Sequence, residues 1–355
     1  MPFTTEQISY AGKAAMDYIL RGKPEDLYNT ERPLLKWLRA NQKSFPGAKQ
    51  YINEKLRTTN DANFQWFGPD GLVTYNRKRT LEDANFEWRS AHDGFGLTEE
   101  ELLQNYISVT DDPSATPTTS EKHQFINLIT ENTETLMEGF KEKFDYDLHL
   151  DGTASTDSLV GLDALISTTP TSGIVGGIDR STSGNEYWMN HADTGIAATA
   201  GVLTTHMEQV WRACYRVGGN APNFILCGSK FLDAYRTDAK SEIDRQLRVS
   251  GTGGSSLDSS TGEGTNSGLY FKGVPLTWDP IMDDLQTALD PTVDWDKRCY
   301  FLNSRFLKLR PAKGQDMITR RPPRSYDRYT HYWGLTWRGG LTTNRPGSMA
   351  VLSIV

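Results

Sequence analysis

The apolar positions follow different patterns in successive parts of the 355-residue chain. Residues 5–20 and 34–38 have short runs with helical spacing, too short to close a core by themselves. The region 60–92 alternates large aromatic and polar side chains around the turn signal Gly68-Pro69-Asp70-Gly71. This pattern predicts a long β-hairpin with the basic residues 77–79 at its tip. Because an isolated two-stranded hairpin is marginal in water, we expect it to pack on a neighbour, in the same chain or another.

The longest helical pattern lies between 118 and 149. Apolar residues recur there at intervals of three or four from Phe125 to Phe144, and Thr118 with Glu121 forms a capping box at the start. At 1.5 Å per residue such a helix is about 45 Å long, which suits a strut. A short acidic helix over 98–108 is expected before it, with Glu99 and Glu100 at its positively polarised N-terminal end.

The remainder of the chain mixes helical and strand patterns. Helices are predicted over 198–216 and from Ser229, and a buried strand over 223–227. Further strands are predicted over 269–278, 299–302 and 306–310, and alternation around Trp333, Leu335 and Trp337 indicates another. The order of these elements predicts an α+β fold, with about two domains or one domain that carries large extensions.

The composition adds a hint of assembly. Hydrophobic residues make up 37% of the chain, slightly few for its length, yet it has 9 Trp, 15 Tyr and 14 Phe. This fits aromatic anchors that are buried partly against other chains. No apolar run reaches the roughly 18–20 residues of a membrane helix, and the start shows no signal-peptide pattern, so we expect no contact with a membrane. Cys214, Cys227 and Cys299 are far apart, which predicts buried thiols in a reducing compartment.

The net charge of −7 averages two opposite segments. Residues 82–157 hold 18 acids and four bases, a balance of −14, whereas the last fifty residues hold nine bases and two acids, a balance of +7. The basic segment could be a solvated face or a face for nucleic acid. Its sign also suits the acidic segment, in the same chain or in another copy, and we favour contact between copies.

No catalytic constellation is visible in the sequence. None of the six histidines has a close metal-ligand spacing, and no nucleophile elbow or dinucleotide-binding glycine motif occurs. Gly228-Ser229-Lys230 follows a predicted strand but lacks the spacing of a phosphate loop. We therefore predict a protein that is not an enzyme, with no cofactor and no metal site.

Several segments together resemble the major capsid proteins of tailed bacteriophages. They are Asp151-Gly152-Thr153 directly after the long helix, residues 161–166 (GLDALI), 173–180 (GIVGGIDR), 271–279 (FKGVPLTWD) and 300–309 (YFLNSRFLKL). The order of arm, hairpin, long helix, mixed domain and strand-rich end matches as well, and the resemblance covers most of 60–355. It implies a tight loop at Gly176 and Gly177 that needs positive φ or close backbone approach.

The resemblance implies the Hong Kong 97-type capsid fold. Its parts would be an N-terminal arm at 1–57 and an extended β-hairpin, the E-loop, at 58–95. A peripheral domain would take 96–149 and 312–340 and contain the long spine helix at 118–149. An axial domain would take 150–311 and 341–355. No long scaffolding segment precedes the arm, so a separate scaffold protein or none is expected.

The implied function is that of a shell subunit. The chain would self-assemble through hexamers and pentamers into an icosahedral capsid around double-stranded DNA, touched without sequence specificity. Portal and scaffold or decoration proteins would be further partners, and the location would be the virion, assembled in the cytoplasm of a bacterial host. Two alternatives remain open: an encapsulin-like nanocompartment shell, and a soluble hydrolase or carbohydrate-binding protein that uses the many aromatics.

The candidate site is a set of contacts between subunits. For the aromatic members an ordinary place in the core of the chain is an equal alternative. Reversing the charges of the basic hairpin residues is expected to impair assembly and leave the subunit folded. The candidates are Phe64, Trp66, Arg77, Lys78, Arg79, Phe86, Trp88, Glu99, Glu100, Arg320, Arg321 and Arg324.

Overall fold

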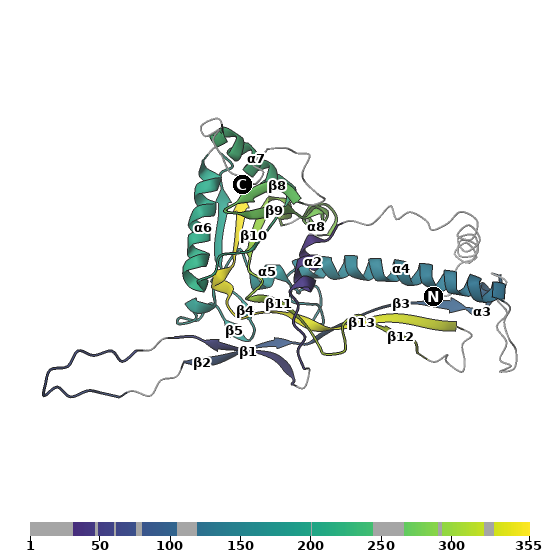
Figure 1. Ribbon diagram of the computed structural model, residues 1–355, viewed down its shortest axis with the longest axis horizontal. Helices are drawn as coiled ribbons and strands as arrows, with labels where there is room; N and C mark the ends of the chain where they lie inside the picture. Colours follow the sequence, from purple (N-terminus) through teal and green to yellow (C-terminus); the bar gives the residue numbers. More distant parts are fainter. Residues whose placement is uncertain are drawn as a thin grey trace. The chain divides into compact units, whose positions relative to one another are not determined.

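The computed structural model describes residues 31–46, 49–59, 62–75, 80–104, 119–199, 201–243, 266–289, 293–322 and 330–355. The described residues divide into two units. The smaller unit comprises Ser90–Phe144 and Gly314–Arg338. The larger unit comprises Glu31–Arg89, Asp145–Lys313 and Gly339–Val355. The expected mixture of helices and strands is present in both (Figure 1).

The smaller unit packs one long helix against a narrow sheet. The helix is α4 (Thr119–His149), which confirms the long helix expected from the apolar spacing and enters the larger unit at Asp145. Strands β3 (Arg89–Thr98) and β12 (Ile318–Arg320) both pair with β13 (Thr330–Thr343). The short helix α3 (Glu99–Gln104) follows β3, and its acidic first turn lies where the sequence predicts it.

Aromatic side chains join α4 to this sheet. Phe144 meets Trp337 edge to face at 4.6 Å between ring centroids, and Phe95 stacks on Trp333 at 5.5 Å. Ile129 of α4 packs with these two rings and the buried Leu97. Alternate residues of each strand therefore face α4, and the intervening residues face away from it.

The larger unit is built on a six-stranded sheet in the order β6-β14-β10-β7-β9-β8. The pairs β6–β14 and β7–β9 are parallel and the other neighbours are antiparallel. The strands are β6 (His191–Ile196), β7 (Phe224–Cys227), β8 (Asn266–Phe271), β9 (Val274–Trp278), β10 (Arg298–Leu302) and β14 (Ala350–Ile354). Strand β11 (Leu307–Pro311) pairs with the last residues of β13.

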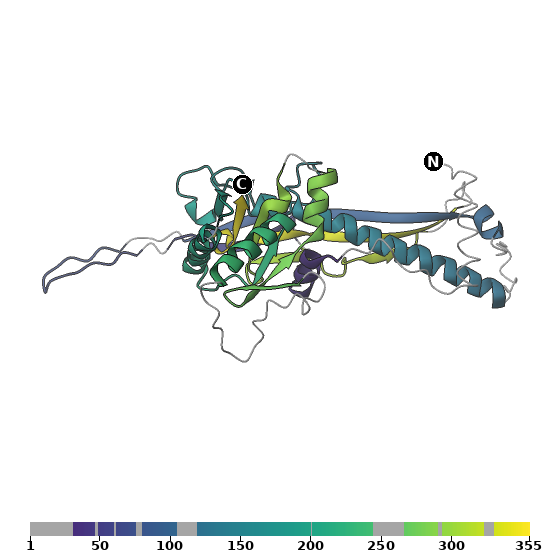
Figure 2. The same ribbon diagram turned by 90° about the horizontal axis from the view of Figure 1, so that it is seen from above.

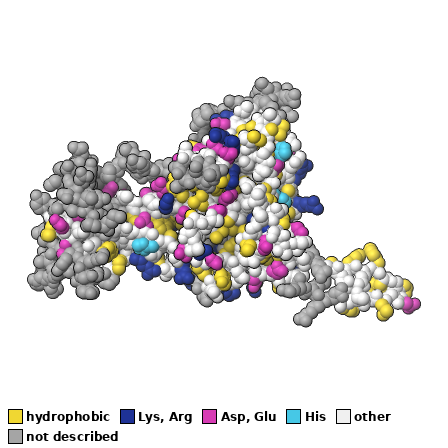
Figure 3. All heavy atoms as spheres, turned by 180° about the vertical axis from the view of Figure 1, so that it is seen from behind, with side chains coloured by type: hydrophobic (Ala, Val, Ile, Leu, Met, Phe, Trp, Pro, Cys, Tyr) yellow, Lys and Arg dark blue, Asp and Glu magenta, His cyan; other side chains and the backbone are white. Residues whose placement is uncertain are grey.

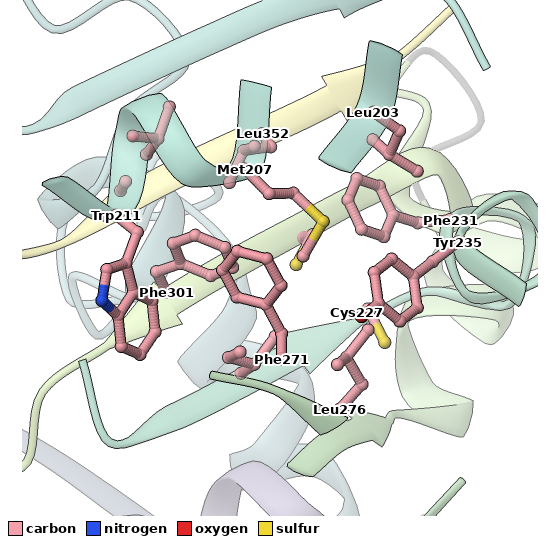
Figure 4. Close-up of a cluster of buried hydrophobic side chains, with 14 of the residues drawn as sticks. Leu203, Met207, Trp211, Cys227, Phe231, Tyr235, Phe271, Leu276, Phe301 and Leu352 are labelled. Carbon is pink, nitrogen blue, oxygen red and sulfur yellow. The ribbon is translucent and has the colours of Figure 1, made fainter. Parts of the chain in front are cut away.

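Helices α6 (Val202–Gly218) and α7 (Ser229–Ile243) cover one face of this sheet. Trp211 of α6 meets the rings of Phe271 and Phe301 edge to face, and Met207 of α6 and Phe231 of α7 belong to the same buried cluster, as Figure 4 shows. Both helices and strand β7 were predicted from the sequence. The remaining short helices are α2 (Pro33–Ala40), α5 (Leu162–Leu165) and α8 (Pro280–Asp284), with short helical turns at Glu186–Trp188, Leu285–Leu289, Trp295–Lys297 and Pro346–Ser348.

The hairpin is present, but its first strand lies outside the predicted region. Strand β1 (Tyr51–Arg57) pairs antiparallel with β2 (Leu81–Glu87), and a long loop connects them and extends away from the sheet of the larger unit (Figure 2). Within 62–75, the described part of the loop, no strand is assigned. The ladder forms where Ile52 and Phe86 bury one side of the hairpin, because a strand pair needs a covered face.

A second, two-residue hairpin confirms the expected glycine loop. Strands β4 (Ile174–Val175) and β5 (Ile178–Asp179) are joined by Gly176 and Gly177, whose φ angles are 58° and 76°. Both lie in the left-handed region that favours glycine. The carbonyl of Gly176 accepts a 2.8 Å hydrogen bond from the Asn85 backbone N–H, so this hairpin docks on β2.

Gly176→Ala is expected to lower the free energy of unfolding by about 2–3 kcal/mol, since it adds left-handed strain and crowds β2. A Cβ at Gly176 would approach Phe86 Cζ to 3.1 Å, whereas one at Gly177 would meet nothing within 4 Å. Gly177→Ala therefore carries the strain without the crowding and serves as the control in urea denaturation. Equal losses in the two variants would contradict the docking of this turn on β2.

Candidate functional site: an exposed loop and a basic groove

The loop between β1 and β2 exposes a row of large apolar side chains. Phe64 is 73% exposed, Trp66 91%, Leu72 96% and Tyr75 93%. Figure 3 shows these hydrophobic side chains along the loop and an acidic one at its end. Such a concentration of exposed apolar surface on one segment is typical of an interaction site.

Polar side chains of the loop hold its two sides together. The Gln65 amide accepts from the Thr74 backbone N–H at 3.3 Å, and it donates to Asn63 Oδ1 at 2.8 Å. The chain reverses at the predicted turn, where the Gly71 N–H donates to the Gly68 carbonyl at 2.9 Å. Because polar residues pair across the loop, the aromatic residues between them point outward, and Asp70 at the turn is the sole charged residue of 62–75.

A groove of about 600 Å³ lies in the smaller unit, lined by residues of β3, β12 and β13 and by the two residues that follow β12. Three of its lining residues are the glycines Gly94, Gly96 and Gly334. The remaining lining residues are His92, Phe95, Arg320, Arg321, Pro322, Tyr332 and Trp333. The groove thus combines an apolar, aromatic interior with two cationic side chains.

Arg320 is held at the groove by its own unit. Its Nε donates to Thr336 Oγ1 at 3.2 Å and its terminal nitrogen donates to Gln315 Oε1 at 2.8 Å. Both partners are uncharged, so these bonds orient the guanidinium without neutralising it. The neighbouring Arg321 is exposed. An anionic group that enters the groove would therefore meet positive charge beside aromatic surface.

The structure separates the predicted contact residues into groups. Phe64 and Trp66 lie on the exposed loop, and Arg320 and Arg321 line the groove. Glu100 is exposed, whereas Glu99 lies 3.9 Å from His331 Nε2 in the same unit. The last group, Arg77, Lys78, Arg79 and Arg324, falls outside the described residues.

One aromatic candidate, Phe86, and the predicted tip need correction, whereas Trp88 stays a prediction. Phe86 is 6% exposed and packs beside Gly176, so the core of its own chain accounts for it. Trp88 is half-buried, contacts the Phe45 ring and donates to the Lys49 carbonyl at 3.0 Å. The loop reverses at 68–71 and not at 77–79, because residues 63 and 65 lie opposite Thr74.

Sequence reasoning missed several residues of these surfaces. It did not select Leu72 or Tyr75, which belong to the same alternating pattern, or Asp70, which belongs to the turn signal between the two sides of the loop. It also missed the groove residues His92 and Tyr332, because the groove joins strands more than two hundred residues apart in the sequence.

The described residues contain neither a metal-binding cluster nor an exposed thiol. Within them no group of three or more His, Cys, Asp or Glu side chains is arranged to hold a metal ion. The three cysteines are buried, as predicted, and burial raises the pKa of Cys214 to about 12, which makes that thiol a poor nucleophile. None of the described helices is both long and apolar enough to cross a membrane.

No family model matches the chain, and no curated protein matches its sequence. Solved structures do match it. The chain in the capsid asymmetric unit of Cyanophage A-1(L) has a TM-score of 0.62 and 15% identity over 94% of this chain and 95% of that chain. A chain in the capsid of Myoviridae phage XM1 gives 0.52 and 13% over 95% and 97%. One from the capsid of an empty GTA particle gives 0.53 and 12% over 94% and 99%.

The likeness extends over nearly the whole chain in each case. The expected fold class is therefore confirmed, and the chain has the α+β fold of phage capsid chains.

Proposed function

We propose that this protein is the major subunit of an icosahedral shell around a double-stranded DNA phage genome. The observation that carries the proposal is the loop at 62–75, whose apolar side chains are exposed in the isolated chain. Burying each such side chain against another molecule stabilises the contact by about 1.5–3 kcal/mol. A subunit with this loop is best suited to a state in which another molecule covers it.

A second copy is the partner that we propose for the loop. The fold shared with capsid chains supports a subunit that meets many copies of itself, as hexamers and pentamers of a shell. Such self-association assigns the protein to the virion, with assembly in the bacterial cytoplasm. Within the capsid fold we assign the loop between β1 and β2 to the E-loop and α4 to the spine helix. Portal, scaffold or decoration proteins and non-specific DNA contact remain expectations from the resemblance.

The two units support the proposed peripheral and axial domains. We propose the peripheral domain at 96–149 and 312–340 and the axial domain at 150–311 and 341–355. The structure divides the chain nearby, at Phe144, Gly314 and Arg338, and it groups the hairpin with the larger unit. The proposed role is structural, and we assign no residue to catalysis.

The basic groove is the surface that we propose as the counterpart of the loop in another copy. The loop presents aromatic side chains and one carboxylate at Asp70, and the groove presents aromatic walls with Arg320 and Arg321. Apolar surfaces would be buried while opposite charges meet, which favours one orientation of the loop. This contact would engage part of the basic segment noted in the sequence, whereas Asp70 lies outside the acidic segment at 82–157.

Light scattering and electron microscopy of the purified full chain test the proposed function. We expect closed particles that contain many copies. A monomer of about 40 kDa, or a dimer, in every condition would contradict the proposal and favour the soluble hydrolase or carbohydrate-binding alternative. Particles formed in the native host that contain protein cargo in place of DNA would favour the encapsulin-like alternative.

A further inference from the structure

Three ionisable side chains meet in the core of the larger unit. Asp145 and His149 stand one turn apart at the C-terminal end of α4, and Asp279 directly precedes α8. All three are completely buried. His149 Nε2 lies 3.0 Å from Asp279 Oδ2, and His149 Nδ1 lies 2.8 Å from the carbonyl oxygen of Asp145.

The partners of His149 define where its protons are. A carbonyl oxygen can only accept, so Nδ1 carries a proton. Asp279 Oδ1 accepts a 3.1 Å hydrogen bond from the Ile281 N–H, so the Asp279 side chain caps the start of α8. Nε2 therefore donates to a carboxylate, and His149 is an imidazolium. Burial opposes this charge, but Asp279 and then Asp145 raise the pKa of His149 to about 9.

Asp145 has a less favourable place in the same cluster. Among the described residues neither of its buried carboxylate oxygens has a hydrogen-bond partner of good geometry. Burial raises the pKa of Asp145 to about 7, and Asp279 adds to this, while His149, Arg32 and the backbone N–H of Leu35 act in the opposite direction. Arg32 and Leu35 belong to the start of α2, so α2 also faces this carboxylate.

We propose that Asp145 makes the junction of α2, α4 and α8 a proton-sensitive joint, which is tight when Asp145 is protonated and weakened when it is ionised. Protonation removes a buried charge that has no hydrogen bond of good geometry among the described residues, and it ends the repulsion of this charge by Asp279. The ion pair of His149 with Asp279 then remains as the single charged contact of the three. Helix α2 lies in the predicted N-terminal arm, so its attachment to the body would depend on pH.

The sign follows from proton linkage. The pKa of Asp145 is higher in the folded chain than its ordinary value of 3.8. The ionised carboxylate therefore lowers the stability of the joint increasingly from about pH 4, and this effect is complete above about pH 7. The ordinary pKa of His149 is 6.5, so its stabilising effect is complete below that pH and is lost as the pH rises through about 9. Both groups favour the joint on the acid side of neutrality.

Hydrogen exchange of α2 in the full chain tests this joint. Opening that restores the ordinary pKa of Asp145 would become about thirtyfold more favourable between pH 5.5 and 8.5 through this group alone. After correction for intrinsic exchange, Asp145→Asn should therefore lose about that factor of the pH dependence. Asp147→Asn, an exposed change two residues along α4, is the control and should keep it.

The two possible results are distinct. Unchanged pH dependence in Asp145→Asn would overturn the proposal, as would equal loosening of α2 at both pH values. If that variant does not fold, isotope-edited infrared spectroscopy of the wild-type carboxylic acids replaces it. One buried aspartic acid should then titrate near neutrality, and the absence of a carboxylic acid band above pH 5.5 would overturn the proposal. Neither measurement depends on shell assembly, so failure of the shell proposal would leave this one standing.

Discussion

Replacing Trp66, Leu72 and Tyr75 together by serine is expected to abolish particle formation while leaving the thermal stability of the subunit unchanged. All three side chains are more than 90% exposed, so the folded chain loses almost no packing when they are removed. In the shell each would be an apolar anchor, and anchors of this kind contribute about 2 kcal/mol or more to a contact. Because every subunit carries the three substitutions, this free energy is lost at each contact of the shell. Light scattering with calorimetry of the same samples separates assembly from folding.

Phe86→Ser is the matched control, because it removes an aromatic residue from the same hairpin. Phe86 is buried within its own chain, so this variant should lose about 3–5 kcal/mol of stability and unfold at a lower temperature. The two variants should thus fail in different measurements. Normal particles from the triple variant would show that the loop is no contact between copies.

Periodicity predicted the elements that cover one continuous apolar face. The spacing that includes Phe140 and Phe144 indicated a long helix, and α4 has these residues buried on one side. Alternation around Leu335 and Trp337 indicated a strand for the same reason. In each case the pattern and the burial have the same physical cause, a single face in contact with a partner element.

The hairpin shows where this reasoning fails. The aromatic residues at 64–75 have the strongest strand pattern, yet the ladder forms at β1 and β2 on either side of them. Alternation reveals that one face will be covered, but it does not reveal whether the cover is in the same molecule. Phe86 is covered by the Gly176 turn, whereas Trp66 stays 91% exposed and is not covered by the described residues of its own chain.

Contacts between segments far apart in the chain could not be predicted from the sequence either. Asp279 lies 130 residues from His149, and neither residue belongs to a motif that indicates a buried ion pair. The groove depends on glycines in two strands, and a glycine in a strand is equally consistent with a bulge or a close backbone approach. Such sites become visible once the topology brings the strands together.

Reversing the groove charges with Arg320→Glu and Arg321→Glu is expected to raise the critical concentration for assembly at least tenfold, equivalent to about 1.4 kcal/mol per contact. The new carboxylates would repel Asp70 of the neighbouring copy beside aromatic walls that limit screening by water. Adding Asp70→Lys to the same chain restores opposite charges, so most of the assembly should return. Static light scattering over a concentration series measures each variant.

The rescue by Asp70→Lys tests whether Asp70 and the groove arginines contact each other. Asp70→Lys alone should impair assembly, because it places a cation against Arg320 and Arg321, yet it should improve assembly in the reversed background. Arg338→Glu changes an exposed arginine of strand β13 outside the groove lining, so it should not be rescued by Asp70→Lys. A triple variant that assembles worse than the double variant would show that Asp70 and the groove arginines do not meet. The sign of the coupling therefore decides between a specific contact and two independent surface charges.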